Sequence, residues 1–224
     1  MSLKIIAGTY GGRVLRTVRG LGTRPLLGQV RESVFNILAE QIPDAIVWDL
    51  FAGTGASGVE SLSRGAARVL FCEKNGKAID VLRQNLQTLG DDAVARSVVM
   101  RADAWDPPLM NHATFGGGRD DADEEGDEDE VAPDVVFLDP PYAMVAEDPV
   151  KSMARARRLL DRTARGGCVV FHFETGVLDE DDFDDDLDLD LREWGTTAIA
   201  FLWRRGEAPE RQQRRWAKER AQAD

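Results

Sequence analysis

The stretch Asp49-Leu50-Phe51-Ala52-Gly53-Thr54-Gly55-Ala56-Ser57-Gly58 is a glycine-rich turn that follows an apolar run. Three of its glycines have the spacing with which a strand turns into a helix and lets the backbone approach a ligand closely. Glu73 lies 20 residues beyond Gly53, at the end of the next apolar run, where an acid can bind ribose hydroxyls. The turn therefore predicts a strand–turn–helix unit of an open α/β sheet with a cofactor at its edge.

Apolar runs and amphipathic stretches alternate on both sides of this turn. Strands are expected at residues 46–51, 68–72, 95–100, 135–138 and 168–173, and helices at 58–63, 77–89 and 150–164. Two further runs, 187–194 and 197–203, flank Gly195 as an antiparallel pair. Repeated βα units imply a doubly wound, mostly parallel, seven-stranded Rossmann-like sheet with an antiparallel last strand and helices on both faces.

The N-terminal segment departs from this alternation. Short β-like runs at 4–7 and 13–18 flank a glycine-rich turn and predict a hairpin, and apolar residues from Val30 to Leu38 have helical spacing. We therefore expect three parts, which are a target-contacting N-terminal hairpin and helix at 1–42, a main domain at 43–205 and a basic tail at 206–224.

Acidic residues are concentrated in two segments of a chain whose formal net charge is −12. Residues 119–134 and 179–193 each hold ten acidic side chains and one arginine, and the rest of the chain has 26 basic against 20 acidic residues. The first segment belongs to an insert at 111–133 with too few apolar residues to offset the entropy of ordering, so we expect it to be disordered. We expect the acidic run at 179–190 to be a mobile surface connection.

Basic residues gather near both ends of the chain. The first 40 residues hold six Lys and Arg, and the segment 204–220 holds seven. Clustered positive charge can pair with phosphates, because salt screens the distant acidic segments beyond about 8–10 Å. A solvated basic surface is the alternative. The candidate phosphate contacts are Arg13, Arg24 and Arg31.

Few residues indicate redox or metal chemistry. Cys72 and Cys168 lie in apolar runs and are expected to be reduced and buried. His112 and His172 stand alone, and no Cys/His/Asp cluster has metal-ligand spacing, so we expect no metal. The N-terminus lacks the apolar region of a signal peptide, and no apolar run approaches the ~20 residues that span a bilayer, which favours the cytoplasm.

A second motif, Asp139-Pro140-Pro141-Tyr142, follows the apolar run at 135–138. A carboxylate, two imino acids and an aromatic ring form a rigid shelf with polar acceptors and one flat face, which suits an amino group on a planar base. Asp49 and Asp103 add carboxylates that can meet a cationic amino-acid group and an adenine amino group. All these positions fall at the carboxyl ends of predicted strands, where open α/β sheets bind ligands. Taken singly, each acid is equally compatible with a helix cap or a turn.

The glycine turn, Glu73, Asp103 and the Asp139–Tyr142 motif resemble the motifs of the class I S-adenosylmethionine-dependent methyltransferases. The chain also resembles the bacterial RsmD family, which methylates N2 of a guanine in small-subunit (16S) ribosomal RNA, in the segments Ile5-Ile6-Ala7-Gly8, Gly12-Arg13, Arg24-Pro25, Val30-Arg31-Glu32 and Phe35-Asn36. The stretch Leu26–Gln29 departs from the polar residues usual in that family. The resemblance implies small-subunit ribosomal RNA as the partner, free or in an assembling 30S particle, and a monomeric enzyme.

The resemblance also implies a role for each residue of the two motifs. The cofactor S-adenosylmethionine, which yields S-adenosylhomocysteine, would be bound by Asp49, Phe51, Ala52, Gly53, Gly55, Glu73, Asp103 and Ala104. The base would be held by Asp139, Pro140, Pro141 and Tyr142. A base stacked in folded RNA must first be extruded, at a cost of a few kcal/mol.

Three other functions stay open on the sequence alone. The Asp139–Tyr142 motif also suits methylation of adenine N6 or cytosine N4 in DNA or in another RNA. The glycine turn with Glu73 is compatible with an NAD-dependent oxidoreductase. A non-catalytic RNA-binding assembly factor could keep the fold without the chemistry. The intact set of acids and glycines favours the methyltransferase.

Overall fold

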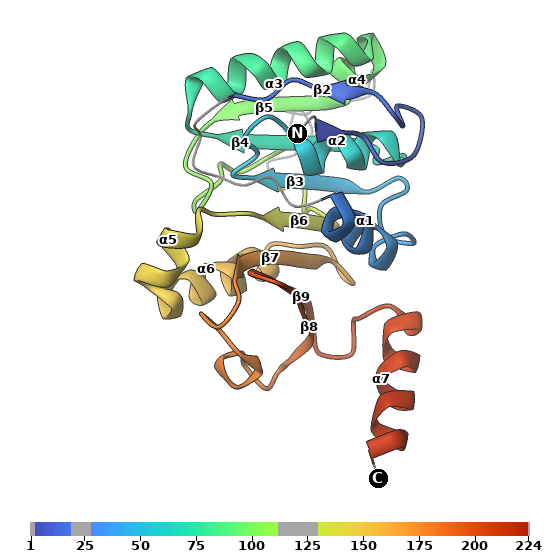
Figure 1. Cartoon of the computed structure of the whole chain (residues 1–224), viewed down its shortest axis with the longest axis vertical. Helices are drawn as coiled ribbons and strands as arrows, with labels where there is room; N and C mark the ends of the chain where they lie inside the picture. Colours follow the sequence, from blue (N-terminus) through green and yellow to red (C-terminus); the bar gives the residue numbers. More distant parts are fainter. Residues whose placement is uncertain (1–2, 19–27, 112–129, 224) are drawn as a thin grey trace, which may run out of the picture.

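The structure, a computed structural model, describes residues 3–18, 28–111 and 130–223, with side chains up to residue 218. At its centre is a seven-stranded sheet in the order β5-β4-β3-β6-β7-β9-β8 (Figure 1). Strands β3 to β7 run parallel, and β9 is antiparallel to β7 and β8. The strands are β3 (Ile46–Leu50), β4 (Arg68–Glu73), β5 (Ser97–Arg101), β6 (Val135–Leu138), β7 (Cys168–Glu174), β8 (Leu187–Trp194) and β9 (Thr197–Arg204). The predicted fold class is confirmed.

Helices cover both faces of the sheet. They are α1 (Gly28–Ile37), α2 (Ala56–Ser63), α3 (Gly76–Leu89), α4 (Asp91–Ala95), α5 (Tyr142–Glu147), α6 (Pro149–Asp161) and α7 (Glu210–Ala223). Side chains alternate along a strand, so Val47 of β3 packs in a core with α1, α2 and α3, whereas Trp48 packs in a second core with α5 and α6. Both are fully buried. The central strands are therefore covered on both sides, which explains their continuous apolar runs.

Local signals set the ends of the long helices. The side chain of Asn75 accepts hydrogen bonds from the backbone N–H groups of Lys77 and Ala78 at the start of α3. Asp148 accepts from the N–H of Lys151 at the start of α6, and Pro149 occupies the first turn of that helix. These caps explain why α3 and α6 begin within one residue of their predicted starts.

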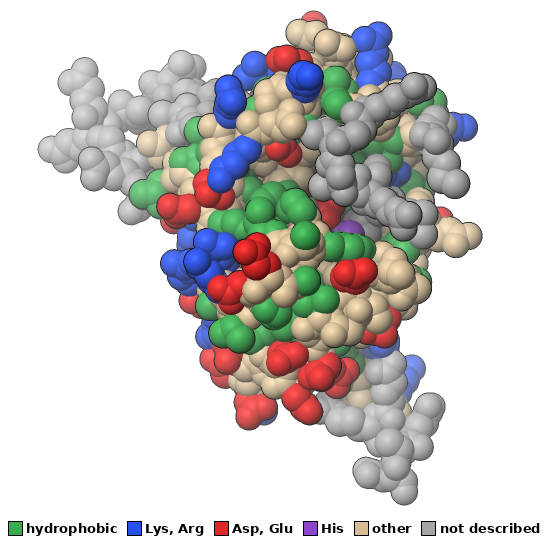
Figure 2. Space-filling model, turned by 60° about the vertical axis from the view of Figure 1, so that its left-hand side comes forward, with side chains coloured by type: hydrophobic (Ala, Val, Ile, Leu, Met, Phe, Trp, Pro, Cys, Tyr) green, Lys and Arg blue, Asp and Glu red, His purple; other side chains and the backbone are tan. Residues whose placement is uncertain are grey.

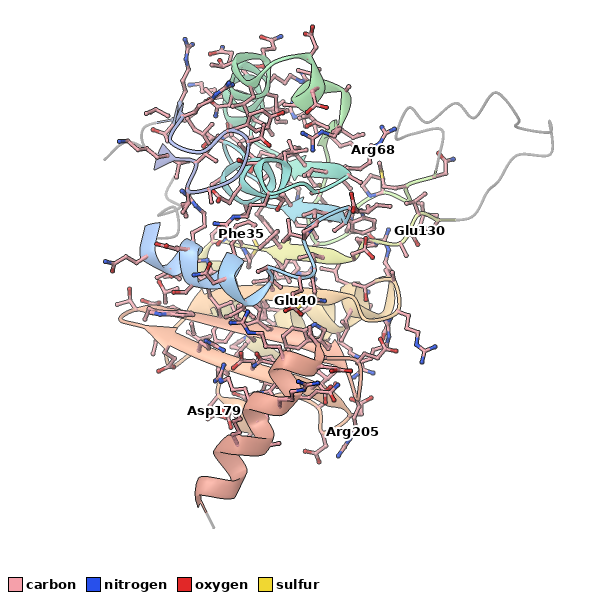
Figure 3. The ribbon with its side chains drawn as sticks, turned by 90° about the vertical axis from the view of Figure 1, so that its right-hand side faces the viewer. Phe35, Glu40, Arg68, Glu130, Asp179 and Arg205 are labelled. Atoms are coloured by element: carbon pink, nitrogen blue, oxygen red, sulfur yellow. The ribbon has the colours of Figure 1, made fainter. Side chains whose placement is uncertain are left out.

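The predicted N-terminal hairpin is present but short, with β1 (Leu3–Lys4) antiparallel to β2 (Val14–Leu15). It is fastened to α2, because the buried carboxylate of Glu60 accepts hydrogen bonds from the N–H groups of Ile6 (2.7 Å) and Ala7 (3.1 Å). Helix α1 lies over β6, and its Phe35 ring packs 5.3 Å from that of Phe137 (Figure 3). The segment therefore shares a core with the sheet, and the division at residue 42 stays a prediction.

The prediction of a mobile connection at 179–190 is wrong. This run contains a 3-10 turn, η1 (Glu180–Asp182), and the first half of β8. Asp186 forms a two-pronged ion pair with Arg157 of α6, and Asp190 is only 4% exposed. Some of the charges that predicted mobility are instead paired with distant arginines, since Asp184 and Asp186 pair with Arg157 and Asp190 pairs with Arg215.

The insert predicted to be disordered at 111–133 lies mostly outside the described residues. Its two ends meet, because the N–H of Val131 donates to the carbonyl of Met110 (2.6 Å) and Glu130 forms an ion pair with Arg162 (Figure 3). The four residues 130–133 are therefore part of the folded structure, and the prediction was too broad at this end.

Three helices were not predicted. Helices α4 and α5 have five and six residues, too few to show a helical period, and α7 occupies the tail that was recognised only as basic. Among the described helices, none combines the length and apolar character needed to cross a membrane.

Candidate active site at the carboxyl ends of the strands

The sheet brings the two motifs together at one edge. Strands β3 and β6 are neighbours with Leu50 paired to Leu138, so the glycine turn and the Asp139–Tyr142 motif begin at matched positions. The N–H of Asp139 donates to the carbonyl of Leu50 (3.4 Å). Glu73 ends β4, on the other side of β3, and Asp103 follows β5. The four polar positions therefore lie along one rim in the order 103, 73, 49–55 and 139.

The glycine turn has a backbone that few residue types tolerate. Phe51, Gly53 and Gly55 all have positive φ angles, of 61°, 55° and 89°. A Cβ atom on Gly55 would lie 2.3 Å from Leu82, whereas one on Gly53 would meet nothing closer than 4.0 Å. Gly55 is thus required by packing, and Gly53 leaves an open backbone surface at the rim that a ligand can approach.

Asp49 lies beneath this turn, 3% exposed. Its Oδ2 accepts a hydrogen bond from the N–H of Gly58 (2.8 Å), in the first turn of α2. Burial raises the pKa of Asp49 well above its ordinary value, and the negative charges of Asp139 and Glu73 raise it further. A cationic ligand group beside Asp49 would offset this cost and favour the charged carboxylate, so the site fits the amino group of an amino-acid ligand.

Glu73 and Asp103 line the rim beyond the turn. Glu73 accepts hydrogen bonds from the N–H groups of Gly53 (2.8 Å) and Asn75 (2.7 Å), so it fixes the turn to the end of β4. Asp103 forms an ion pair with Lys74 (2.8 Å) and accepts from the N–H of Trp105 (3.0 Å). The hydrogen bond from Lys74 lowers the pKa of Asp103. Both acids therefore place acceptor oxygens beside the open backbone of Gly53.

The prediction that His172 stands alone is wrong, because it joins two residues of the second motif. Its Nδ1 is hydrogen-bonded to Oδ1 of Asp139, and its Nε2 lies 2.8 Å from the hydroxyl of Tyr142. That hydroxyl also lies 3.1 Å from Oγ1 of Thr197. His172 is 4% exposed and comes from β7, one position beyond the pair Leu138–Phe171. Its polar ring in an otherwise apolar buried strand was the one available sequence signal.

This network selects one tautomer of the neutral imidazole. A carboxylate only accepts hydrogen bonds, so Nδ1 of a neutral His172 carries the proton and donates to Asp139. Nε2 then accepts from the hydroxyl of Tyr142, which in turn accepts from Thr197. The rings of Tyr142 and His172 meet edge to face, with centroids 5.1 Å apart. The orientations of the carboxylate and the phenol ring are therefore fixed by one buried side chain.

An aromatic wall that sequence reasoning missed connects the two ends of the rim. The ring of Trp105 meets that of Phe51 edge to face (5.2 Å), and its Nε1 donates to the sulfur of Met144 in α5 (2.8 Å). The guanidinium of Arg155 lies 5.0 Å from the centre of the Trp105 ring. Ala104, beside Trp105, is 2% exposed. The loop after β5 is thus tied to α5, the helix that begins at Tyr142.

The residues present fit S-adenosylmethionine. That molecule has a cationic amino group, a sulfonium, ribose hydroxyls and an adenine amino group. The rim offers Asp49 for the amino group, Glu73 for the ribose hydroxyls and Asp103 for the adenine amino group. The open backbone at Gly53 and the ring of Phe51 leave one approachable side of the turn. An NAD pyrophosphate, in contrast, would meet the charge of Asp49 behind the turn.

The three candidate phosphate contacts have different positions. Arg13 donates to the carbonyls of Thr88 and Leu89 at the end of α3 and is exposed. Arg31 is 3% exposed and donates to the carbonyl of Lys4, and burial lowers its pKa, which argues against the predicted phosphate contact. Arg24 lies outside the described residues.

Charge is unevenly distributed on the face that carries α5. Figure 2 shows most of its acidic side chains in the lower half, basic side chains in the upper part and along the left edge, and hydrophobic side chains across the middle. Exposed apolar residues near the rim include Met144 of α5 (39%) and Val150 of α6 (74%).

Comparison with known proteins identifies relatives over most of the chain. The family described as "Conserved hypothetical protein 95" matches residues 3–202. Two curated relatives carry the name "Ribosomal RNA small subunit methyltransferase D". The protein from Haemophilus influenzae is 34% identical over 142 residues, which is 62% of this chain and 64% of the relative. The protein from Escherichia coli K12 is 42% identical over 100 residues, which is 44% of this chain and 50% of the relative.

A solved structure extends the likeness to the whole fold. The Escherichia coli protein described as "Putative methyltransferase yhhF" superposes with a TM-score of 0.66 at 26% identity. The superposition covers 93% of this chain and 100% of that protein. This chain covers only one half to two thirds of the length of the curated relatives, whereas its superposition on the solved Escherichia coli structure covers that protein completely.

Proposed function

Since the chain belongs to the family described as Conserved hypothetical protein 95, the RsmD-like methyltransferases, we propose that it transfers a methyl group from S-adenosylmethionine to N2 of a guanine in small-subunit ribosomal RNA. The observation that carries the proposal is the joint placement of the glycine turn and the Asp139–Tyr142 motif on one rim, with His172 holding Asp139 and Tyr142.

The cofactor would lie along β3, β4 and β5. Asp49 orients its amino-acid end, Glu73 receives the ribose hydroxyls, and Asp103 with the backbone of Ala104 receives the adenine. Phe51, Ala52, Gly53 and Gly55 form the turn against which it lies. When bound, S-adenosylmethionine supplies a methyl group on a sulfonium with a good leaving group. The protein therefore needs to contribute mainly positioning, which is worth up to about 7–11 kcal/mol.

The base would be held by the second motif. Tyr142 stacks on the extruded guanine, a contact worth about 1–3 kcal/mol in comparable aromatic–base pairs. Because His172 occupies Oδ1 of Asp139, the other carboxylate oxygen is available to accept a hydrogen bond from the exocyclic amine. The carbonyl of Pro140 is the second acceptor. Two acceptors direct the nitrogen lone pair toward the cofactor, and Asp139 takes the proton that the amine loses after transfer.

The proposal specifies guanine as the base, N2 as the methylated atom and ribosomal RNA as the substrate, and one experiment tests all three. The protein is incubated with methyl-labelled S-adenosylmethionine and, separately, undermodified small-subunit particles, the naked ribosomal RNA and DNA. Digestion and chromatography then identify the labelled nucleoside. We expect label in N2-methylguanosine. Label in N6-methyladenine or N4-methylcytosine would replace the proposal with the rival amino-group methylator, and binding of NAD without transfer would replace it with the oxidoreductase.

A variant assigns the chemistry to Asp139. We expect Asp139→Ala to abolish turnover and to leave the calorimetric affinity for S-adenosylhomocysteine nearly unchanged, because Asp139 faces the base and not the cofactor. Asp80→Ala, on the exposed face of α3, is the matched control and should behave as wild type. If Asp139→Ala loses cofactor affinity instead, Asp139 is a cofactor ligand and the assignment of the base pocket is wrong.

A further inference from the structure

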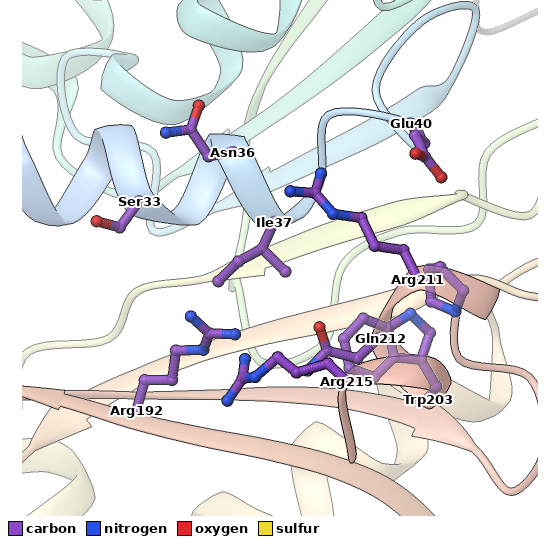
Figure 4. A pocket seen from close by; sticks show the side chains of 10 residues that line it. Ser33, Asn36, Ile37, Glu40, Arg192, Trp203, Arg211, Gln212 and Arg215 are labelled. Atoms are coloured by element: carbon purple, nitrogen blue, oxygen red, sulfur yellow. The ribbon is translucent and has the colours of Figure 1, made fainter. Parts of the chain in front are cut away.

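A cavity of about 370 Å³ lies between α1, the β8–β9 hairpin and α7, and no part of the proposed chemistry uses it (Figure 4). Figure 1 shows α1 and α7 on the side of the molecule opposite α5, which begins at Tyr142 of the base-binding motif. The charged residues of its lining are three arginines, Arg192 of β8 and Arg211 and Arg215 of α7, with Glu40 as the one carboxylate. The cavity is thus a positively charged site remote from the rim.

A buried carboxylate pre-positions two of these arginines. Asp190, 4% exposed, accepts hydrogen bonds from Nε of Arg192 (2.9 Å) and Nη1 of Arg215 (3.3 Å). It also accepts from Nε2 of Gln212 (2.6 Å), which is buried in the same wall. A carboxylate is shared by two guanidinium groups here, so the wall keeps a net positive charge and holds both side chains in place.

The third arginine completes the cavity from above. Figure 4 shows Arg192 and Arg215 on one side of Ile37, and Arg211 reaching across from α7 toward the end of α1. Arg211 is exposed and has no ion-pair or hydrogen-bond partner among the described residues. Its five donors are therefore available to a ligand, and guanidinium groups bind phosphate oxygens in a two-pronged geometry.

The place of this cavity in the chain indicates its ligand. Its walls come from α1, in the basic N-terminal segment, and from α7, in the basic C-terminal segment. The positive charge of the lining comes from Arg192 of β8 and from Arg211 and Arg215 in the basic C-terminal segment. Ser33 and Asn36 of α1 add small polar groups at its upper edge (Figure 4). This combination fits an oxyanion of a polymer better than an apolar ligand.

We propose that the cavity between α1 and α7 binds a backbone phosphate of the RNA substrate at a point distant from the methylated base. The proposal rests on the proposed function, because it assumes RNA as the substrate. An RNA that occupies both the rim and this cavity must extend around the sheet past β9 and β8. A fragment limited to the target hairpin would lack the second contact, so large RNA should bind more tightly than the fragment.

The test compares Arg211→Gln with Arg214→Gln. Arg214 lies on the same helix and carries the same charge, but its side chain is 77% exposed, pairs with Glu210 and does not line the cavity. Equilibrium binding of a long small-subunit RNA fragment and of a minimal target hairpin is measured at several salt concentrations, together with the single-turnover methylation rate at saturating RNA.

We expect Arg211→Gln to weaken binding of the long RNA by about tenfold at low salt and to reduce the salt slope by about 0.7–0.9. Its binding of the minimal hairpin and its single-turnover rate should match wild type, and Arg214→Gln should stay within about twofold throughout. Equal effects of the two variants, or a loss confined to the single-turnover rate, would overturn the proposal. Failure of the wild-type protein to methylate any RNA would instead remove the proposed function itself.

Discussion

His172 is the residue on which the base-binding geometry most depends. It holds Asp139 through Nδ1 and Tyr142 through Nε2, and it is buried against both. A residue of this kind acts by positioning, because it touches neither the methyl donor nor the base in the proposed arrangement. Loss of the Nδ1 contact to Asp139 should therefore lower turnover, and loss of the Nε2 contact to Tyr142 should weaken RNA binding.

The two nitrogens can be removed separately. His172→Gln keeps a polar atom near Tyr142, whereas His172→Asn keeps a donor near Asp139, and His172→Phe removes both. We expect His172→Gln to lower kcat about 10–100-fold with little change in KM for RNA, and His172→Asn mainly to raise that KM. His172→Phe should combine the two losses, with cofactor affinity unchanged. Wild-type kinetics in a folded His172→Phe protein would remove the positioning role.

We expect the buried carboxyl of Asp49 to lower the stability of the cofactor-free protein at neutral pH. Its folded pKa is raised by burial, so the folded state binds the proton more tightly than the unfolded chain. The associated stability is present below the unfolded value of about 4 and is lost as pH rises through the folded pKa. Asp49→Asn removes this titration and keeps an acceptor for the N–H of Gly58. We expect a Tm gain of about 3 °C at neutral pH that shrinks toward pH 4, with weaker cofactor binding.

Asp92 is a control, because its effect on stability is expected to depend on pH in the opposite direction to that of Asp49. A hydrogen bond from Arg96 lowers the pKa of its carboxyl, so its stabilisation is present above the unfolded value and lost as pH falls. Asp92→Asn should therefore lower Tm at neutral pH and match wild type in acid. Thermal melts of both variants from pH 2 to 7 check the two signs, because the stabilisation by Asp92 is lost below its unfolded pKa of about 4. Parallel pH profiles for the pair would show that neither carboxyl titrates as described.

At the scale of elements, α2 packs against β4 through a glycine. A Cβ atom on Gly58 would lie 2.2 Å from the ring of Phe71, which is fully buried and cannot move without opening the core. We expect Gly58→Ala to destabilise the protein by about 1–3 kcal/mol in urea unfolding. Gly76→Ala, at an open position in the first turn of α3, is the control and should be neutral or stabilising by about 0.4–1 kcal/mol. Equal midpoints for the two variants would show that α2 can shift.

The elements that sequence predicted well are those with a long, regular apolar pattern. The βα units from 46 to 89 were predicted within about two residues, because buried strands and amphipathic helices carry their period in their own residues. Helices α4 and α5 are too short to carry one. The run at 179–190 was misjudged because Asp186 pairs with Arg157 and Asp190 with Arg215, and no local pattern reveals partners that distant.

At the scale of the whole molecule, the rim was predictable and the inside of the site was not. Parallel strands place their carboxyl ends at one edge, so the positions of Asp49, Glu73, Asp103 and Asp139 follow from strand order alone. His172 reaches the same site from β7, and Trp105 reaches it from the loop after β5. Those contacts depend on side-chain direction in three dimensions, which strand order does not specify.

The acidic insert provides the final prediction, which concerns the charge of the molecule as a whole. Residues 112–129 hold eight acidic side chains and one arginine, so their removal changes the formal net charge from −12 to −5. The chain on either side is already closed by the hydrogen bond between Val131 and Met110. Replacing 112–129 with Asn-Gly, a two-residue turn, should therefore leave Tm within about 2 °C.

The same deletion should accelerate RNA association, because long-range repulsion between the acidic residues and phosphates is removed. We expect the association rate measured by stopped flow to rise several-fold at low ionic strength and to converge with wild type at high salt. A full-length variant with the eight acids changed to Asn and Gln separates charge from chain length, and it should reproduce the acceleration. If the neutralised variant has the wild-type association rate while the deletion is faster, the insert slows RNA association through its bulk. The negative charge of the insert then has no effect on the association rate.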